Sequence, residues 1–503
     1  METTVKTTYG ALQGVKRQNH QVYLGIPYAR PPVGKLRFAA PEPSDKWDGV
    51  RQATAFSASS IQSSHPIPGF AADGPISEDC LYLNVYTPAA DDKKRPVMFW
   101  VHGGGFTHGT ADSPIYNGGF LAELGDVVVV TINYRLGALG FLYLGDHGGK
   151  AWGASANCGL LDQIAALKWV RDNIAAFGGD PGLVTIFGES AGASSVVSLM
   201  AMPGARGLFH RVIAQSGTAS QLAGPQQASR LAEDILSELG LGSGQTQRLL
   251  EVPAADILEA QTQVLARLQT AGLNLRTSPV VDGETLPCQP LEAVARGEAR
   301  HISFMAGTNR DEVKLFKDFR NIKTISDEEL ERLAEEVRPK NTRAGTAEMI
   351  RVYKESRARH GLPVNNENID DAIHTDQRFR IPCLKLAEAH GQAHVYLFTW
   401  QSPARRGAMG ACHALEMPFV FGTHTHPMEE RFTGTGPEAD RLSRAMMAAW
   451  IAFARSGDPN HEALGGWAVY DRKRRATMIF GRESEVQDAP FEEERAVWEP
   501  VEE

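Results

Sequence analysis

Short apolar runs alternate with helix-like segments along most of this 503-residue chain. Residues 5–15 and 20–23 alternate apolar and polar positions, which predicts an antiparallel hairpin near the N-terminus. Residues 97–102 and 127–134 are almost entirely apolar, a pattern typical of central strands that are covered on both faces. The first part of the chain therefore predicts an edge hairpin followed by the buried centre of a sheet.

Predicted strands and helices then alternate along the rest of the chain. Helices are predicted at residues 163–177, 193–201, 225–240, 326–337 and 440–456, and strands at residues 183–187, 211–217, 302–307 and 394–400. Such alternation favours an α/β fold with a central, mostly parallel sheet flanked by helices. We expect one domain over residues 1–503, with insertions.

Composition and charge are those of an ordinary globular enzyme, with 42% hydrophobic and 22% charged residues. The net charge of −9 argues against a nucleic-acid partner, and the most basic run, residues 472–475, is interpreted as a solvated turn. No apolar run reaches membrane-spanning length, and the first residues lack the apolar core of a signal peptide. We therefore expect no membrane contact.

The cysteines indicate neither a zinc site nor a disulfide framework, because they are odd in number, scattered and without a CxxC pair. They are Cys80, Cys158, Cys288, Cys383 and Cys412. His424 and His426 are interpreted as loop residues, because no third ligand accompanies them at metal-binding spacing. We expect a reduced, cytoplasmic protein without a metal or an organic cofactor.

The strongest chemical signal is Gly188-Glu-Ser-Ala-Gly192, which lies between a short apolar strand and an Ala-, Ser- and Val-rich helix. Strand, G-x-S-x-G and helix in that order are typical of a nucleophile elbow, whose strained turn exposes a serine hydroxyl. Glycines two residues before and after the serine are expected because a Cβ there would collide with the neighbouring strand and helix. We predict that Ser190 is a nucleophile.

A serine nucleophile needs a base to take its proton, and the base needs an acid to orient it. With this elbow the expected chain order is serine, acid, histidine. The loop Thr308-Asn-Arg-Asp-Glu312 follows a predicted strand, and spacing alone leaves both Asp311 and Glu312 as candidates for the acid. His413 lies in a loop of small residues after a later strand, as expected of the base.

Donors for an oxyanion are predicted in His102-Gly-Gly-Gly-Phe106, which directly follows an apolar strand. Glycines in such a loop allow backbone N–H groups to approach a developing negative charge. Gly104 and Gly105 are predicted to supply two donors. Ala191, directly after the nucleophile, is predicted to supply a third.

With these residues in place, the chain closely resembles the type-B carboxylesterase/cholinesterase family, nearest to its bacterial p-nitrobenzyl-esterase-like branch. The likeness covers nearly the whole length. Its further motifs are Gly25-Ile-Pro-Tyr-Ala29, Ser77-Glu-Asp-Cys-Leu-Tyr-Leu-Asn84, Asn133-Tyr-Arg-Leu-Gly137, Asn157-Cys-Gly-Leu-Leu-Asp-Gln163 and Gln215-Ser-Gly217. The resemblance implies an α/β-hydrolase fold with a triad of Ser190, His413 and Glu312, and it supports the three oxyanion donors named above.

The resemblance also implies positions for supporting residues. Glu189 and Ser216 are expected near the triad, in a second shell around it. Buried ion pairs are expected between Arg37 and Glu78 and between Arg135 and Asp162.

Two departures from the family pattern affect the expected gorge. Secreted relatives join the counterpart of Cys80 to an upstream cysteine, whereas Ser60 stands in that place here, so the loop of residues 60–80 has no disulfide. This loop walls the active-site gorge in relatives. Phe70 stands where cholinesterases have a cation-binding tryptophan, and because Phe is the weaker cation–π partner, a choline-ester specialist is not expected.

Substrate choice is expected to depend on the gorge-wall loop of residues 60–80 and on an insertion at residues 315–380 that forms a lid. Aromatic residues of the gorge region are candidates for the apolar lining of the pocket, and these are Phe70, Phe106, Phe316 and Phe319.

Together these features predict a serine carboxylesterase that hydrolyses short-to-medium-chain or aryl carboxylic esters through an acyl-enzyme on Ser190. An amidase or carbamate hydrolase with the same triad is the alternative, since the motifs do not separate C–O from C–N cleavage. A lipase and a pure binding protein are further rivals. The expected partner is a small-molecule ester, and the expected state is a monomer or a weak homo-oligomer.

Overall fold

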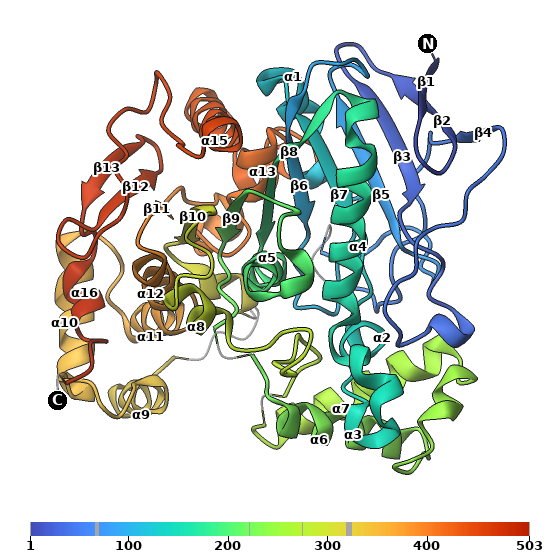
Figure 1. Cartoon of the computed structure of the whole chain (residues 1–503). Coiled ribbons are helices and arrows are strands. Elements are labelled where there is room, and N and C mark those ends of the chain that lie inside the picture. The colour runs from blue at the N-terminus through green and yellow to red at the C-terminus, as the bar shows by residue number, and fades with distance from the viewer. Residues whose placement is uncertain (1, 66–69, 221, 274, 318–323, 502–503) are drawn as a thin grey trace. The chain divides into compact units, whose positions relative to one another are not determined.

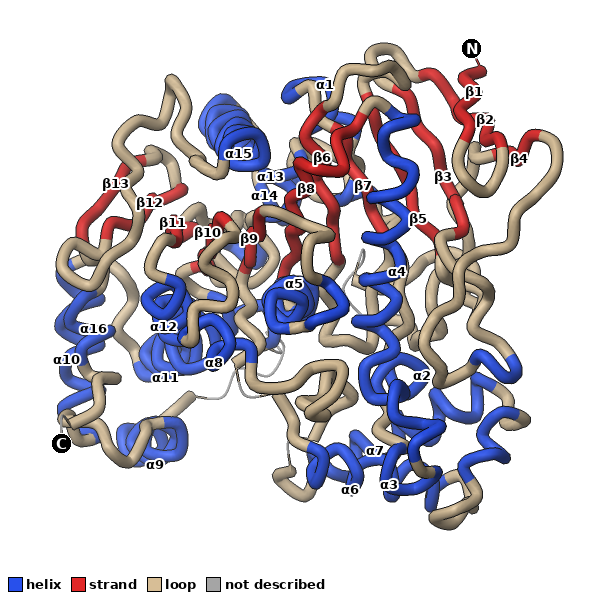
Figure 2. The backbone as a smooth tube through the Cα atoms, viewed as in Figure 1, coloured by secondary structure: helices blue, strands red, loops and turns tan. Residues whose placement is uncertain are grey.

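The computed structural model describes residues 2–65, 70–220, 222–273, 275–317 and 324–501. The chain divides into two compact units, which are shown in Figure 1 and by type of element in Figure 2. Unit 1 comprises Met1–Ala214, Ala219–Ser303 and Ile451–Asp458, and unit 2 comprises Gln215–Thr218, Phe304–Trp450 and Pro459–Glu503. The expectation of one domain over residues 1–503 stays a prediction.

Unit 1 is built on a sheet whose strands are β1 (Glu2–Lys6), β2 (Ala11–Lys16), β3 (Gln21–Pro27), β4 (Val50–Gln52), β5 (Tyr82–Thr87), β6 (Arg95–Val101), β7 (Val128–Ile132), β8 (Gly179–Glu189) and β9 (Arg211–Gln215). Their order is β1-β2-β3-β5-β7-β6-β8-β9, and β4 pairs with β2 beside this path. The β1–β2, β2–β3, β3–β5 and β5–β7 pairs are antiparallel, which confirms the predicted hairpin. β6 is parallel to both β7 and β8.

The centre of this sheet is buried on both faces, as its nearly unbroken apolar runs predicted. Every residue of β6 and β7 is buried, and Val97 and Val101 pair with Val128 and Ile132 across the two strands. Apolar runs without alternation suit a strand only when helices cover both of its faces. The α/β-hydrolase fold class is thereby confirmed at the element level.

The helices of unit 1 cover this sheet and extend below it in the view of Figure 1. They are α1 (Gly119–Gly125), α2 (Gly137–Phe141), α3 (Gly145–Gly148), α4 (Cys158–Asn173), α5 (Ala191–Ala201), α6 (Pro225–Glu238), α7 (Ala254–Thr270) and α8 (Pro290–Ala295). α4 and α5 both contact β8, so the strand that leads to Ser190 is covered by the helix that follows it.

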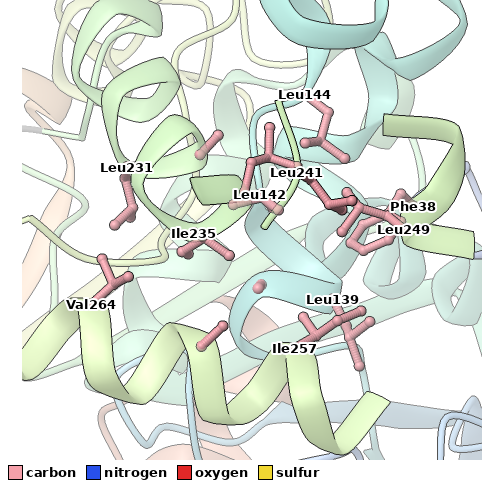
Figure 3. Packing of buried hydrophobic residues seen from close by; sticks show 14 of the residues in the cluster. Phe38, Leu139, Leu142, Leu144, Leu231, Ile235, Leu241, Leu249, Ile257 and Val264 are labelled. Atoms are coloured by element: carbon pink, nitrogen blue, oxygen red, sulfur yellow. The ribbon is translucent and has the colours of Figure 1, made fainter. Parts of the chain in front are cut away.

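A second apolar core of unit 1 lies among α2, α6 and α7. Ile235 of α6, Ile257 of α7 and Leu139 of α2 are buried in one cluster with Phe38 (Figure 3). Burial of side chains of this size contributes about 1.5–3 kcal/mol each relative to an exposed position. This cluster fixes α6 and α7 against the segment that carries the Asn133-Tyr-Arg-Leu-Gly137 motif.

Unit 2 contains β10 (Ser303–Asn309), β11 (Ala393–Phe398), β12 (Ala476–Phe480) and β13 (Glu485–Asp488), in that order. β10, β11 and β12 are parallel to their neighbours, and β13 is antiparallel to β12. Its helices are α9 (Asp327–Val337), α10 (Thr346–Arg359), α11 (Asn366–Thr375), α12 (Ile381–His390), α13 (Met417–Phe421), α14 (Glu430–Thr433), the greater part of α15 (Pro437–Ser456) and α16 (Glu492–Ala496).

Within residues 315–380, where the lid insertion is predicted, the described residues include α9, α10, α11 and the π-helical turn Asp376–Arg380. Leu330 of α9, Met349 and Tyr353 of α10 and Ile369 of α11 are buried together with Trp498 from the end of the chain. The Ser326 hydroxyl accepts a hydrogen bond of 3.2 Å from the Glu329 N–H, which confirms the predicted N-cap of α9.

One surface interpretation is partly wrong. Residues 472–475 do form a turn, but the Arg475 side chain is only 12% exposed and lies 2.5 Å from Glu388. It also donates a hydrogen bond of 3.2 Å to the Tyr470 hydroxyl. Arg475 directly precedes β12, so its side chain is held against the edge of the sheet and away from solvent.

The two predicted ion pairs are confirmed. Arg135 donates to Asp162 from its Nε at 2.8 Å, from its Nη2 at 2.7 Å and from its backbone N–H at 3.0 Å. Arg37 donates to both carboxylate oxygens of Glu78 at 2.6 Å. Removing one partner of such a buried pair costs about 3–5 kcal/mol because the other charge stays buried.

All five cysteines are free thiols, and Cys80 is buried beside Ser60. Burial raises the pKa of the Cys80 thiol to about 12, and a hydrogen bond with Ser60 offsets part of that rise. Ser60 also donates from its hydroxyl to the Tyr134 carbonyl at 2.5 Å. The serine therefore occupies the place where the resemblance puts the second half of a disulfide.

Among the described residues, no helix is both long enough and apolar enough to cross a membrane.

We predict that Ser60→Cys forms a disulfide with Cys80 under oxidising conditions, because the two side chains already touch. Closing a loop of this length should raise the free energy of unfolding by about 3 kcal/mol. Thermal melts with and without reductant measure the gain, and Ser60→Ala is the control that should show no dependence on reductant. If all thiols of the oxidised Ser60→Cys protein remain titratable after denaturation, the inferred side-chain contact is wrong.

Candidate active site

Ser190 lies at the junction of β8 and α5 in unit 1, in a strained backbone conformation. Its φ is 56° and its ψ is −117°, a region that non-glycine residues adopt only when the surrounding structure holds them there. The turn from strand to helix has the geometry expected of a nucleophile elbow.

The glycines on either side of Ser190 are required by close contact between backbones. A Cβ on Gly188 would lie 2.5 Å from the backbone carbon of Gly192, and a Cβ on Gly192 would lie 2.0 Å from the Val101 carbonyl oxygen. Neither distance is tolerated by real side chains, so only glycine fits at both positions. The steric reason predicted for the G-x-S-x-G pattern is confirmed.

The glycine loop that follows β6 lies against the elbow. A Cβ on Gly103 would be 2.7 Å from the Glu189 carbonyl oxygen and 3.1 Å from the Ser190 Cβ. Gly104 has a φ of 103° and Gly105 a φ of 63°, both in the region that favours glycine. The loop therefore reaches Ser190 through backbone atoms alone.

The hydrogen bonds of this loop fix the direction of its N–H groups. The Gly103 carbonyl accepts from the His102 side chain at 2.8 Å, and the Gly104 carbonyl accepts from the N–H groups of Thr107 and His108 at 3.1 and 3.0 Å. In a trans peptide the C=O and the following N–H point in opposite directions. The N–H groups of Gly104 and Gly105 therefore point away from the donors that bind these two carbonyls.

Ala191 is the third predicted donor. It is the first residue of α5, so its N–H has no acceptor within the helix, and it adjoins Ser190 directly. The positive end of the helix dipole adds to the attraction for an anion at this position. Gly104, Gly105 and Ala191 stay the predicted donors of an oxyanion hole.

His102 supports this loop as a neutral side chain. Burial lowers its pKa to about 4, and its hydrogen bond to the Gly103 carbonyl offsets part of that effect. Because a carbonyl only accepts, Nδ1 carries the proton. The ring stacks on Tyr134 with centroids 4.5 Å apart, and the Tyr134 hydroxyl donates to the His102 carbonyl at 2.8 Å.

Unit 2 brings Glu312 and His413 together, as the sequence predicted. Glu312 begins the short 3₁₀ helix Glu312–Phe316 after β10, and His413 lies in the loop before α13. His413 Nδ1 is 2.6 Å from Glu312 Oε2, and both side chains are almost fully buried. The other carboxylate oxygen, Oε1, accepts from the Asn309 N–H at 2.8 Å.

This contact sets the tautomer that a base requires. A carboxylate only accepts hydrogen bonds, so the Nδ1 of His413 carries the proton and Nε2 of the neutral ring is left to accept one. The carboxylate also stabilises the imidazolium that forms when Nε2 is protonated. The pair has the chemistry of a general base with its orienting acid.

Asp311, the other candidate for the acid, has a different role. Its Oδ2 accepts from the Ala411 N–H at 2.9 Å and pairs with Arg310 at 2.8 Å. Burial alone would raise the pKa of this carboxyl, but the nearby cations of Arg310, Lys314 and Arg357 hold it well below its usual range. Asp311 therefore joins the Glu312 loop to the His413 loop, whereas the imidazole of His413 is paired with Glu312.

The two predicted supporting residues lie in different units. Glu189 is the last residue of β8 in unit 1, is buried, and packs against the Gly103 backbone. Ser216 lies in unit 2 with a φ of 54°, and its N–H donates to the Gly307 carbonyl at 2.8 Å. Ser216 is thus joined to the strand, β10, that leads to Glu312.

The four candidate lining residues differ in their surroundings. Phe106 is buried and packs edge-on against Phe141, with centroids 5.1 Å apart, and Phe70 stacks on His65 at 5.7 Å. Phe316 is 54% exposed, and its ring centroid lies 5.2 Å from that of His413. Phe319 lies outside the described residues.

Sequence reasoning missed two residues that contact Glu312, His413 or their loops. Phe379 belongs to the π-helical turn Asp376–Arg380, and its ring packs on the His413 ring with centroids 5.0 Å apart. Such turns often occur at functional sites, but no local pattern in the sequence indicated this one. Asn309 donates from its side chain to the Cys412 carbonyl at 2.7 Å, and only its position in the predicted acid loop hinted at a role.

Among the described residues, no group of three or more His, Cys, Asp or Glu side chains is arranged to hold a metal ion. His424, one of the histidines weighed in the sequence, has its Nε2 2.9 Å from Asp440.

Comparisons with known proteins show the family to which the chain belongs. The sequence model of the Carboxylesterase family matches residues 1–498. The chain is 40% identical over 500 residues to para-nitrobenzyl esterase of Bacillus subtilis (strain 168), covering 98% of this chain and 97% of that protein. It is 34% identical over 489 residues to phenmedipham hydrolase of Pseudarthrobacter oxydans, covering 95% and 94% of the two chains.

A solved structure with the same fold is carboxylesterase EST55 of Geobacillus stearothermophilus at pH 6.2. Its TM-score with this chain is 0.87 at 42% sequence identity, and the match covers 99% of this chain and all of that one.

Asp311→Asn tests the tie between the Glu312 and His413 loops. We predict a loss of about 2–4 kcal/mol of stability at pH 7, because three cations lose their buried partner. The folded pKa of Asp311 is depressed, so its contribution is fully present above the unfolded pKa of about 3.9 and is lost as the pH falls further.

Thermal melts of both proteins from pH 8 down to pH 3 measure this difference, which should stay constant to about pH 5 and then shrink. Asp172→Asn is the control, since Asp172 pairs with Arg171 on the surface and should matter little. A difference that grows on acidification would contradict the assigned role of Asp311.

Proposed function

Because the chain belongs to the carboxylesterase family and is a carboxylic-ester hydrolase, we propose that it hydrolyses short-to-medium-chain or aryl esters through an acyl-enzyme on Ser190. The observation that carries this proposal is the strained turn at Ser190, which packs against the glycine loop. The carbonyls of this loop accept hydrogen bonds from within the loop, and its N–H groups therefore point the opposite way. Such a turn exposes a hydroxyl beside donors for the oxyanion.

In the first step, His413 takes the proton of Ser190 at its Nε2 while the serine oxygen attacks the ester carbonyl carbon. The carbonyl oxygen becomes an oxyanion, which the N–H groups of Gly104, Gly105 and Ala191 stabilise. Each such donor is worth about 10²- to 10³-fold in kcat. The donors are fixed by the fold before substrate arrives, so they need no reorganisation during the reaction.

In the second step, His413 gives its proton to the leaving alcohol oxygen and the C–O bond breaks, which leaves the acyl group on Ser190. Water then attacks the acyl carbon with His413 again as the base. The bond between that carbon and the Ser190 oxygen breaks, His413 returns the proton to Ser190, and the carboxylic acid is released. Glu312 holds the tautomer and compensates the positive charge of the ring in both steps. The Phe316 and Phe379 rings flank His413 and restrict its rotation.

The proposal specifies the substrate as a chemical class, defined by its acyl and alcohol groups. The relatives named para-nitrobenzyl esterase and phenmedipham hydrolase differ in the substrates that their names give. We propose esters with apolar acyl or aryl groups, because the aromatic side chains Phe316 and Phe379 line the surroundings of His413. Cleavage of amides is an outcome that the test below distinguishes.

The test compares initial rates for p-nitrophenyl esters from acetate to palmitate in the wild type and in Ser190→Ala. We predict a short-to-medium-chain optimum, and a loss of about 10⁵- to 10⁶-fold in kcat for Ser190→Ala. Glu312→Gln should lower kcat by about 10³- to 10⁴-fold, because the amide no longer selects the required tautomer.

Ser198→Ala is the matched control, because Ser198 is a buried serine of the same helix whose hydroxyl donates to the Ser194 carbonyl at 2.7 Å. It should leave kcat almost unchanged. A p-nitroanilide with the same acyl group completes the set. Rates that survive Ser190→Ala would refute the proposed nucleophile, and faster C–N than C–O cleavage would refute the ester preference.

A further inference from the structure

Gln62 is a buried glutamine whose hydrogen-bonding groups are all used by neighbouring backbone atoms. Its Oε1 accepts from the N–H groups of Gly109 and Ala72 at 2.9 and 3.2 Å. Its Nε2 donates to the carbonyls of Gly109 and Ser60 at 2.8 and 3.0 Å. The side chain therefore holds both the N–H and the C=O of Gly109, as a neighbouring strand would.

Gly109 closes the loop that carries the oxyanion donors. A Cβ on Gly109 would lie 2.3 Å from His102 Nδ1 and 2.6 Å from the Gly103 carbonyl oxygen, so its backbone is packed against the start of the loop. Next to it, the His108 N–H donates to the Gly104 carbonyl. A shift of Gly109 would therefore move the peptides whose N–H groups belong to Gly104 and Gly105.

Only a carboxamide satisfies these contacts at neutral pH. A carboxylate would place oxygen against the Gly109 and Ser60 carbonyls, and an apolar side chain would leave the Gly109 N–H and C=O without partners in a buried place. Water does not readily replace the amide there, because Gln62 is buried, with only 4% of its surface exposed. Unpaired buried polar groups are costly, so the loop would be expected to move to find new partners.

The same amide joins the oxyanion loop to the segment after Ser60. Ala72 is held by Gln62, and Ser63 lies with its Oγ 2.9 Å from His108 Nε2. The disulfide with which secreted relatives are expected to fix this segment is absent here, since Cys80 is a free thiol. Hydrogen bonds through Gln62 take over that attachment.

We propose that Gln62 is a positioning residue for the oxyanion hole, which it aligns by clamping Gly109 at the end of the glycine loop. It does not touch the substrate, and it acts through the backbone that carries Gly104 and Gly105. This inference rests on the proposed function, in which those N–H groups stabilise the oxyanion.

The test uses Gln62→Leu and Gln62→Glu in the full chain, with Gln52→Leu and Gln52→Glu as matched controls. Gln52 is an exposed glutamine of unit 1 whose Nε2 donates a hydrogen bond of 2.9 Å to Gln13 Oε1. Active sites are titrated first, so that kcat refers to folded enzyme. The readouts are kcat, KM, the affinity for a trifluoromethyl ketone that places a negative oxygen in the hole, and hydrogen exchange over residues 103–109.

For Gln62→Leu we expect kcat per titrated site to fall by about 10- to 100-fold with KM changed less than about threefold, since a displaced donor is lost mainly in the transition state. Affinity for the trifluoromethyl ketone should fall by the same factor as kcat. A role in stability alone would lower the number of titrated sites and leave kcat per site unchanged, and that result would overturn the proposal.

Gln62→Glu adds a readout that a merely structural role would not give. Once protonated, its carboxyl can donate to the Gly109 carbonyl as the amide does, so the ratio of variant to wild-type kcat should rise as the pH falls from 8 to 6. A ratio that does not change with pH, together with an unchanged kcat in Gln62→Leu, contradicts the clamp.

Hydrogen exchange separates failure of this inference from failure of the proposed function. The clamp predicts at least tenfold faster exchange over residues 103–109 in Gln62→Leu than in Gln52→Leu, whatever reaction the enzyme catalyses. If the wild type lacks Ser190-dependent hydrolysis but this exchange difference is found, the proposed function fails and the clamp stands. Equal exchange in the two variants would refute the clamp directly.

Discussion

The structure around Ser190 depends on a place where two backbones touch with no side chain between them. β6 and β8 are parallel neighbours, and Val101 pairs with Gly188 at the point where both strands end. There is no room for a Cβ on Gly188 or Gly192. The chain must therefore turn sharply, and Ser190 takes the strained conformation that this turn imposes.

That strain is sustained because the elements on both sides are firmly buried. β6 is buried along its whole length, and α5, which begins directly after Ser190, is buried at nearly every position. Holding a residue in a sparsely populated backbone conformation costs of the order of 1–3 kcal/mol of folding free energy. The packing of the surrounding elements must offset this cost. The apolar centre of the sheet and the exposed hydroxyl are thus two consequences of one packing arrangement.

Charge and hydrogen bonds have the corresponding role around His413. Asn309, Asp311 and Glu312 are consecutive or nearly so, and each binds a different part of the His413 loop. The buried Asp311 is kept ionised by three cations, one of which, Arg357, also lies 3.6 Å from Glu494 of α16. The orientation of the imidazole therefore depends on charges from several helices of unit 2.

The sequence predicted those parts of the molecule in which local pattern and local geometry coincide. The apolar runs of β6 and β7, the glycines around Ser190 and the capping residue Ser326 each belong to a pattern of residues that are close together in the sequence. Their structural reasons are confirmed by burial, steric contact and a hydrogen bond respectively.

Features that depend on contacts between distant segments could not be predicted in this way. Spacing left Asp311 and Glu312 equivalent because they are adjacent, and only the position of His413 separates them. Phe379 belongs to a helical turn far from Glu312 in sequence, and Gln62 reaches Gly109 across 47 positions. Arg475 was placed in solvent because a run of basic residues says nothing about the carboxylate it meets.

The central claim is that Ser190 carries the acyl group during turnover. The most direct measurement is mass spectrometry of enzyme mixed with p-nitrophenyl butyrate and quenched in acid within the first turnovers, followed by peptide mapping. The account predicts a mass increase equal to one butyryl group, located on Ser190 and absent from Ser190→Ala. A butyryl group on another residue, or turnover of the ester with no acylated protein under conditions that slow deacylation, would contradict it.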